Sequence, residues 1–152
     1  MYAGLVRHLV PSMQALRVGD IEVGVAVCRV DDKLHLSSRR ILSFGATYLY
    51  RCDVGETDAF IHSHITSDKA SLKDHMTAIK NNLKHMCIIY PRDGEEWIKC
   101  YKYDLTEEER KQLLKEMEEI QEEAEKSNIE KYRKAVEEYD KKFYLCQEKI
   151  EY

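Results

Sequence analysis

The chain has 152 residues, enough for one domain with its own hydrophobic core. Hydrophobic residues make up 43% of it and charged residues 34%. Residues 105–152 carry 10 basic and 15 acidic side chains, whereas residues 1–104 carry 14 and 13, so the acidity lies in the tail. The near-neutral front part argues against a nucleic-acid surface. No apolar run reaches the roughly 20 residues that span a bilayer, so no membrane segment is predicted.

The cysteines are informative about the redox state. The sequence has five, without C-x-x-C spacing: Cys28, Cys52, Cys87, Cys100 and Cys146. Their number is odd, and no apolar N-terminal signal segment precedes them, which is typical of reduced thiols in an intracellular protein. The sequence therefore predicts free cysteines and a cytoplasmic location.

Residues 2–16 have the apolar spacing of a short helix. The hydrophobic residues recur at intervals of three or four, at Leu5, Leu9, Met13 and Leu16. Pro11 lies inside this pattern and lacks a backbone N–H, so a kink or a break is expected there.

Strands are expected after this helix. From Ile21 the apolar period changes to two, and residues 22–30 alternate like a strand rich in β-branched residues. Asp31 and Asp32 offer a tight turn into residues 33–37, which predicts a hairpin. Two further strands are predicted over 44–51 and 58–62, with a turn-rich loop at 53–57.

A helix and two more strands complete the front part. Apolar residues at intervals of four, three and four predict a helix that runs to about Lys84: Leu72, Met76, Ile79 and Leu83. The strands are expected over 86–90 and 96–103, with a turn at 91–94. Strands that alternate with a helix in this order indicate an α/β or α+β domain of about a hundred residues.

The tail has a different pattern. Thr106 and Glu109 form a capping-box signature at a helix start. Apolar residues then step by three and four, with one slip at Ser127 and Asn128; they are Leu113, Met117, Ile120, Ala124, Ile129, Tyr132, Val136, Tyr139, Phe143, Cys146 and Ile150. One long interrupted helix and a helical hairpin both fit. The apolar stripe either packs on the domain or mediates homodimerisation or partner docking through residues 105–152.

Histidines follow the apolar strand in the stretch FIHSHITSDKASLKDH. In extended backbone His62 and His64 point to the same side, where two imidazoles suit a metal ion. Asp74 lies ten residues on, in the first turn of the next helix, and offers a third ligand. The same residues also fit a plain helix start, with Ser71 as the cap. Spacing alone leaves both interpretations open; the remaining histidines are expected on a polar helix face (His75, His85) or without a partner (His8, His35).

These residues resemble a known zinc signature. His62-Ser63-His64 followed by Ser71-x-x-Asp74 is similar to that of the JAMM (MPN-domain) metalloprotease family, and Glu22 with Gly24 resembles its upstream catalytic glutamate. The resemblance covers residues 1–104 and is strongest to stand-alone prokaryotic or phage versions. It implies a cytidine-deaminase-like, three-layer fold with a mixed central sheet flanked by helices, and leaves residues 105–152 as a charged helical extension.

The loop between the motif's halves departs from the family. Six residues, 65–70, separate His64 from Ser71, where seven are common, and Ile65 stands where a proline often follows. At strict family spacing the aspartate position falls on His75, which becomes an alternative third ligand. A one-residue deletion that keeps Ser71 and Asp74 is the simpler account.

The resemblance implies a zinc-dependent peptidase or isopeptidase. His62, His64 and Asp74 would bind Zn²⁺, Glu22 would be the general base, and Ser71 would stabilise the oxyanion or orient Glu22. The substrate would be a protein or peptide, with ubiquitin-like conjugates among the candidates. The alternative is a non-catalytic MPN-like scaffold that assembles through its C-terminal helix. A zinc nucleoside deaminase is set aside, because it needs a glutamate near its histidine and a P-C-x-x-C pair, and this sequence has neither.

Overall fold

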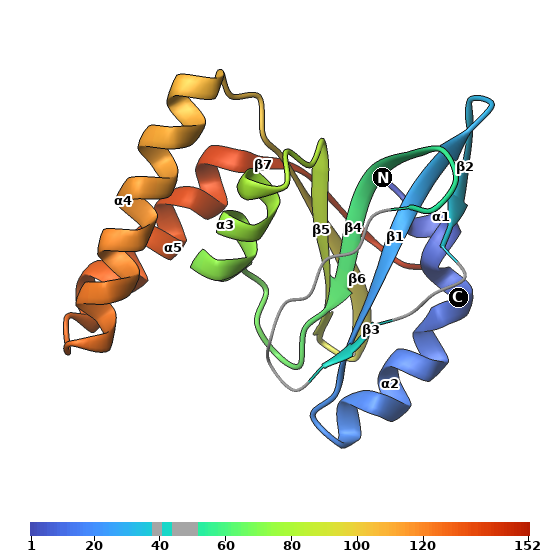
Figure 1. Cartoon of the computed structure of the whole chain (residues 1–152). Coiled ribbons are helices and arrows are strands. Elements are labelled where there is room, and N and C mark those ends of the chain that lie inside the picture. Colours follow the sequence, from blue (N-terminus) through green and yellow to red (C-terminus); the bar gives the residue numbers. More distant parts are fainter. Residues whose placement is uncertain (38–40, 44–51) are drawn as a thin grey trace.

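The computed structural model describes residues 1–37, 41–43 and 52–152, and it places helices on both faces of one mixed sheet (Figure 1). The helical elements are α1 (Ala3–Val6), the 3₁₀ turn η1 (Arg7–Leu9), α2 (Val10–Val18), α3 (Leu72–Lys80), α4 (Glu107–Glu125) and α5 (Ile129–Phe143). The strands are β1 (Glu22–Val30), β2 (Lys33–Leu36), β3 (Ile41–Ser43), β4 (Glu56–Ser63), β5 (His85–Arg92), β6 (Glu95–Lys102) and β7 (Tyr144–Lys149). The predicted α+β class is confirmed.

The strand order is β2-β1-β4-β5-β6-β7, and β3 also pairs with β1. Neighbouring strands are antiparallel except β4 and β5, which are parallel. Parallel neighbours need a crossover, and α3 provides it. The histidine pair therefore lies at the carboxyl end of β4, where the chain leaves the sheet to enter α3.

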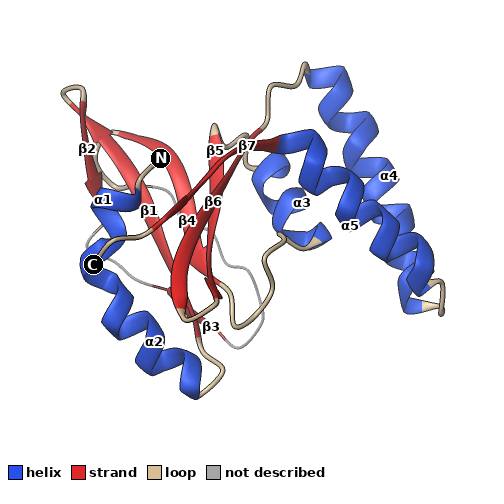
Figure 2. Cartoon of the chain, turned by 180° about the vertical axis from the view of Figure 1, so that it is seen from behind, coloured by secondary structure: helices blue, strands red, loops and turns tan. Residues whose placement is uncertain are grey.

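Two hydrophobic cores lie on opposite faces of the sheet, because successive strand residues alternate in direction. In β1, Val25 and Val27 pack against the layer of α1 and α2. Ala26 and Cys28 join the core under α3, α4 and α5. Figure 2 shows the two helical layers from behind, with the sheet between them.

The first helix is broken, as Pro11 predicted. The 3₁₀ turn η1 separates α1 from α2, and the proline lies in the first turn of α2. Backbone N–H groups in a first turn make no intrahelical hydrogen bond, so the proline costs the helix none. The break changes the buried face. Val6, Val10 and Met13 are buried, whereas the predicted Leu5, Leu9 and Leu16 are only partly so.

The hairpin forms as predicted, with Asp31 and Asp32 in its turn. Both have positive φ, 49° and 62°, which aspartate tolerates and which matches the twist of a two-residue hairpin. The predicted strand 58–62 is confirmed and extended by β4. The strand predicted over 44–51 lies outside the described residues.

Helix α3 ends four residues earlier than predicted. Asn82 takes a left-handed conformation with φ 51°, which stops the helix. His85 therefore opens β5 and does not belong to the helix. The interpretation of His75 and His85 as polar-face helix residues is wrong, because both side chains are buried.

The tail is a helical hairpin followed by a strand. Thr106 and Glu109 form the expected capping box, and Ser127, with φ 98°, lies at the turn between α4 and α5. Helical spacing continues through Cys146 and Ile150, yet the helix ends at Phe143, because the next residues pair with β6 as an edge strand.

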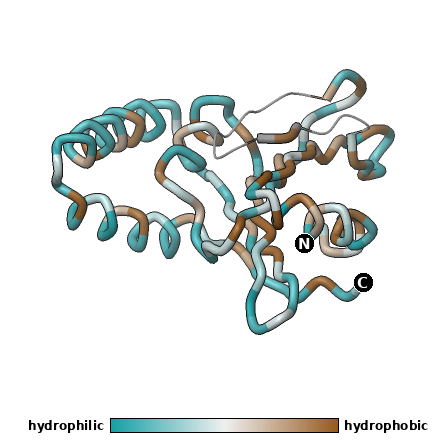
Figure 3. Tube along the Cα trace, turned by 90° about the horizontal axis from the view of Figure 1, so that it is seen from below, coloured by the Kyte–Doolittle hydropathy of each residue, from teal (hydrophilic) through white to brown (hydrophobic). Residues whose placement is uncertain are grey.

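The hairpin's apolar stripe packs on the domain. The core under α3 includes four residues of this stripe, Leu113, Met117, Tyr139 and Phe143, and also Ala135. Hydrophilic residues predominate along the rest of both helices, at the left of Figure 3, and hydrophobic residues gather around the strands. Much of the stripe is thus covered within the chain, whereas Ile129 is 52% exposed.

The prediction of reduced cysteines is wrong for four of the five. Disulfides join Cys28 to Cys52 and Cys87 to Cys100, and Cys146 is free. Strand register, which sequence spacing does not reveal, places Cys87 directly opposite Cys100. The cytoplasmic location therefore stays a prediction, and it is no longer supported by reduced cysteines. Among the described residues no helix is long and apolar enough to cross a membrane.

Candidate metal centre

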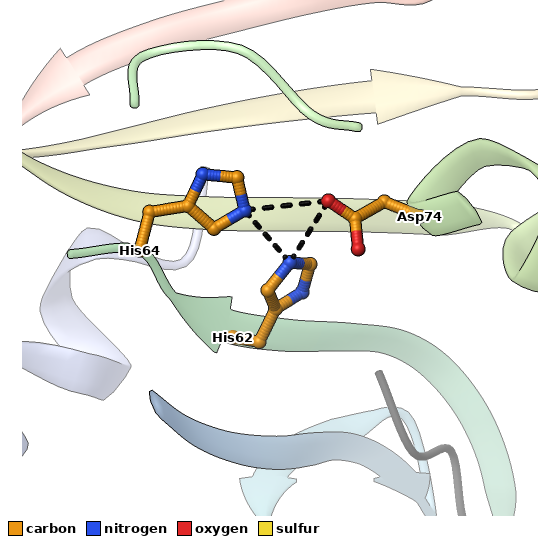
Figure 4. Close-up of side chains that lie close together, drawn as sticks. All are labelled: His62, His64 and Asp74. Carbon is orange, nitrogen blue, oxygen red and sulfur yellow. Dashed lines mark hydrogen bonds and ion pairs between the residues drawn. The ribbon is translucent and has the colours of Figure 1, made fainter. Parts of the chain in front are cut away.

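The end of β4 and the start of α3 bring three candidate ligands together (Figure 4). His62 is the penultimate residue of β4, and the His64 backbone N–H donates to the Ile89 carbonyl at 2.7 Å, which continues the β4–β5 pairing past the strand end. Asp74 lies in the first turn of α3. All three side chains are buried, at 4 to 7% exposure.

The ligand atoms form a small triangle. The two Nε2 atoms of His62 and His64 lie 3.0 Å apart, and each lies 3.3 Å from Oδ2 of Asp74. Tetrahedral zinc with bonds of about 2.0–2.1 Å separates neighbouring ligand atoms by about 3.3 Å. His62, His64 and Asp74 therefore form a group that could hold a metal ion.

The hydrogen bonds around His64 support this interpretation. Its Nδ1 lies 3.0 Å from the carbonyl oxygen of Ser67, which can only accept, so Nδ1 carries the proton. In the neutral ring Nε2 is then an acceptor, and it faces a carboxylate oxygen, another acceptor. A cation between them resolves this conflict, and a backbone carbonyl behind a metal-binding histidine is the usual arrangement.

The site concentrates negative charge around His62. Burial lowers the pKa of this imidazole, but the carboxylates of Asp74 and Glu22 outweigh it and leave the pKa raised. Burial likewise raises the pKa of Asp74, yet the two imidazoles hold it well below its usual range. The pocket thus favours a positive charge at its centre, whether proton or metal ion.

Asp74 is both a helix cap partner and a candidate ligand. Its Oδ2 accepts from the Ser71 N–H at 2.9 Å, and the Ser71 hydroxyl accepts from the Asp74 N–H at 3.1 Å. The interpretation as a helix start and the interpretation as a metal-ligand segment are therefore compatible. The shortened loop keeps Asp74 in the triangle, whereas His75 points into an aromatic cluster and bonds the Tyr103 hydroxyl at 2.7 Å.

Glu22 and Ser71 line one cavity of about 380 Å³ together with His64 and Asp74. Glu22 opens β1, next to β4, and Ser63 ties the strands at this end, because its hydroxyl accepts from the Val23 N–H at 2.8 Å. All five predicted site residues thus lie in or beside this cavity, since His62 contacts both His64 and Asp74.

Gly24 leaves room for an aromatic support. A Cβ at this position would lie 2.7 Å from Cζ of Phe60. The Phe60 ring stacks against His62 with centroids 6.3 Å apart. The glycine near the predicted catalytic glutamate therefore lets Phe60 pack behind His62.

Arg17 is a site residue that the sequence did not indicate. Its guanidinium makes a bidentate ion pair with Glu96, at 2.7 and 2.8 Å, and its Nε donates to the His64 carbonyl at 3.1 Å. The pair joins α2 to β6, 79 residues apart in sequence, and no local spacing signals it. Arg17 fixes the backbone of one candidate ligand.

Helix α5 also reaches the site. Tyr132 and Val136 line the same cavity as Glu22 and Ser71. Their i, i+4 spacing in the tail was predicted to be part of an apolar stripe, but it gave no sign of where that stripe would lie.

Known protein families and curated proteins offer no independent assignment of these residues. The sequence matches no protein-family model, and no curated protein matches it. A function can therefore be inferred only from the geometry and the residues of the centre.

Proposed function

We propose that the chain is a zinc-dependent peptidase or isopeptidase of the JAMM type. One observation carries the proposal: Nε2 of His62, Nε2 of His64 and Oδ2 of Asp74 converge within 3.3 Å of one another, in a cavity that Glu22 and Ser71 also line. Helices on both sides of a mixed sheet agree with the three-layer fold that the resemblance implies.

Each residue has a role in amide hydrolysis. His62, His64 and Asp74 would hold the zinc ion, which when bound would lower the pKa of a water molecule from 15.7 to about 7. Glu22 would act as general base towards the attacking water and as proton donor to the leaving amine. The Ser71 oxygen already accepts from the Asp74 N–H, so its own O–H is free to turn towards the developing oxyanion.

The packing of the tail favours an enzyme over a scaffold. A scaffold that assembles through its C-terminal helix would need an accessible apolar face there. Met117, Tyr139 and Phe143 are instead buried in the domain's own core. The scaffold also offers no reason for two imidazoles and a carboxylate to converge in a cavity.

Replacement of the general base tests the proposal. Glu22→Gln should keep one zinc ion per chain and lose cleavage of a peptide library and of an isopeptide-linked ubiquitin dimer. The expected loss is about 10²- to 10⁴-fold, the contribution of a positioned acid or base. Glu56→Gln is the matched control, because Glu56 is an exposed glutamate at the start of β4. Cleavage by Glu22→Gln at the control's rate would refute the role of Glu22.

A further inference from the structure

The C-terminal helix contributes an apolar surface to the candidate active site. Tyr132 and Val136 lie one turn apart on α5 and line the cavity that contains Glu22, Ser71 and Asp74. Residues four apart point to the same face of a helix, so the two side chains form one continuous patch. Both are partly buried and keep some exposure to the cavity.

The same helix is fixed to the loop of residues 65–70, which also lines the cavity. Asp140, two turns after Tyr132, pairs with the buried Lys99 ammonium at 3.3 Å and accepts from the Tyr101 hydroxyl. Lys99 also donates to the Asp68 carbonyl at 2.6 Å, and Tyr101 accepts from the Ala70 N–H at 3.1 Å.

These four interactions join α5 to residues 65–70, which separate His64 from Ser71. Lys99 is only 6% exposed, so this network is shielded from water and its loss would leave a buried charge unpaired. The position of the α5 patch relative to the metal ligands is therefore set by the fold.

A second contact fixes the end of α5 against α3. Tyr139 and Phe143 pack on the buried ring of His75, with centroids 6.3 and 5.5 Å away. His75 follows Asp74 directly, so the aromatic contact holds α5 next to a candidate metal ligand. Because helix and loop are both fixed, the cavity between them is preorganised for a ligand.

We infer that Tyr132 and Val136 form a specificity subsite for an apolar or aromatic side chain next to the scissile amide. This inference rests on the proposed function. Ile65, which is partly exposed, adds to the apolar part of the cavity from the loop. The remaining surface is polar and includes Glu22, which would face the reacting bond. A substrate residue in this subsite would contact the tail while its amide lies towards Glu22 and Ser71.

Two zinc-binding probes of different size test the subsite. Acetohydroxamate and benzohydroxamate carry the same chelating group, but only the second has an aromatic ring that can reach Tyr132. Their dissociation constants would be measured by calorimetry on the full-length, zinc-loaded chain. We expect benzohydroxamate to bind about fivefold more tightly, the size of one aromatic contact. Tyr132→Ala should remove this preference, and Lys134→Ala, an exposed position on the same helix, should keep it.

The outcomes separate the subsite from the metal centre. An unchanged affinity of Tyr132→Ala for acetohydroxamate shows that the variant is folded and that its metal centre is intact. A preference for benzohydroxamate that survives both Tyr132→Ala and Val136→Ala would overturn the subsite and leave the zinc site standing, as would equal affinities in the wild type. If neither probe binds the zinc-treated wild type, the zinc site itself is wrong and the subsite falls with it.

Discussion

Ser71 and Asp74 cap each other at the start of α3, and the oxygen that closes the cap is the one that faces both histidines. Oδ2 of Asp74 accepts from the Ser71 N–H at 2.9 Å and lies 3.3 Å from each Nε2. A helix cap therefore orients a candidate metal ligand. The N-terminal end of the helix also favours negative charge at this position.

The two residues of this cap should be separable by mutation. Ser71→Ala removes one capping hydrogen bond, so the free energy of unfolding of the metal-free protein should fall by about 1 kcal/mol. Zinc binding should persist, because Asp74 remains. Asp74→Asn should reduce zinc affinity by more than about 100-fold, since loss of a ligand's hydrogen-bond partner alone costs about 10- to 100-fold. Urea unfolding and chelator competition measure both quantities; equal zinc affinities in the two variants would contradict this division.

Arg17 should affect both stability and metal binding. Arg17→Met leaves the Glu96 carboxylate buried without its guanidinium partner, which should lower the unfolding free energy by about 3–5 kcal/mol. The double variant Arg17→Met/Glu96→Gln removes the unpaired charge and should recover part of this loss.

Zinc affinity should respond differently from stability, because the second substitution should not recover it. Both leave the His64 carbonyl without the Arg17 donor, so both should bind zinc about tenfold more weakly. Chelator competition on each folded variant provides the measurement. Wild-type affinity in the double variant would show that Arg17 only stabilises the fold.

Gly24→Ala should disturb the metal centre through Phe60. The added Cβ would lie 2.7 Å from the Phe60 ring, so the ring must move away from its place behind His62. We expect a loss of about 1–3 kcal/mol in unfolding free energy, typical of overpacking, together with weaker zinc binding. Gly4→Ala is the matched control, because nothing lies within 4 Å of its added Cβ, and in α1 it should be neutral or stabilising. Similar results for both variants would argue against a steric role of Gly24.

Asp58 should make stability depend on pH. Burial raises the pKa of its carboxyl, but hydrogen bonds from Tyr2 and Arg29 outweigh this and leave the pKa lowered. The stabilisation should therefore be complete above the unfolded value of about 3.9, and be lost as the pH falls through the lower folded pKa.

Asp58→Asn is the corresponding test. At pH 7 the metal-free variant should be about 1–3 kcal/mol less stable than the wild type, because a charged acceptor is lost. The difference should shrink below about pH 4. Urea unfolding at a series of pH values would show it, and a difference that stays constant down to pH 2 would contradict the assignment.

The placement of the candidate ligands could be predicted because their signal is local, whereas their role as a metal site came from the resemblance to a family. His62 and His64 belong to one strand end, and Ser71 and Asp74 to one helix start, so short spacings determine how they point. Glu22 was found through a resemblance to a family and not through any physical pattern. That choice agrees with its place in the cavity.

The features that were missed depend on tertiary contacts. The helical spacing of the tail continues past Phe143, but pairing with β6 outweighs it and makes a strand. Strand register brings Cys87 opposite Cys100, and the Arg17–Glu96 pair joins α2 to β6. The spacing of Tyr132 predicted an apolar stripe on a helix. Only the folded hairpin brings this residue to the cavity beside the candidate ligands.

The zinc content of the purified protein tests the central claim most directly. After zinc addition and dialysis, mass spectrometry of the metal should find one zinc ion per wild-type chain and one per chain in His35→Ala, a control at an exposed position on β2. His64→Ala should retain almost none. A wild type that takes up no zinc, or a His64→Ala variant that holds as much as the control, would contradict a zinc centre at His62, His64 and Asp74.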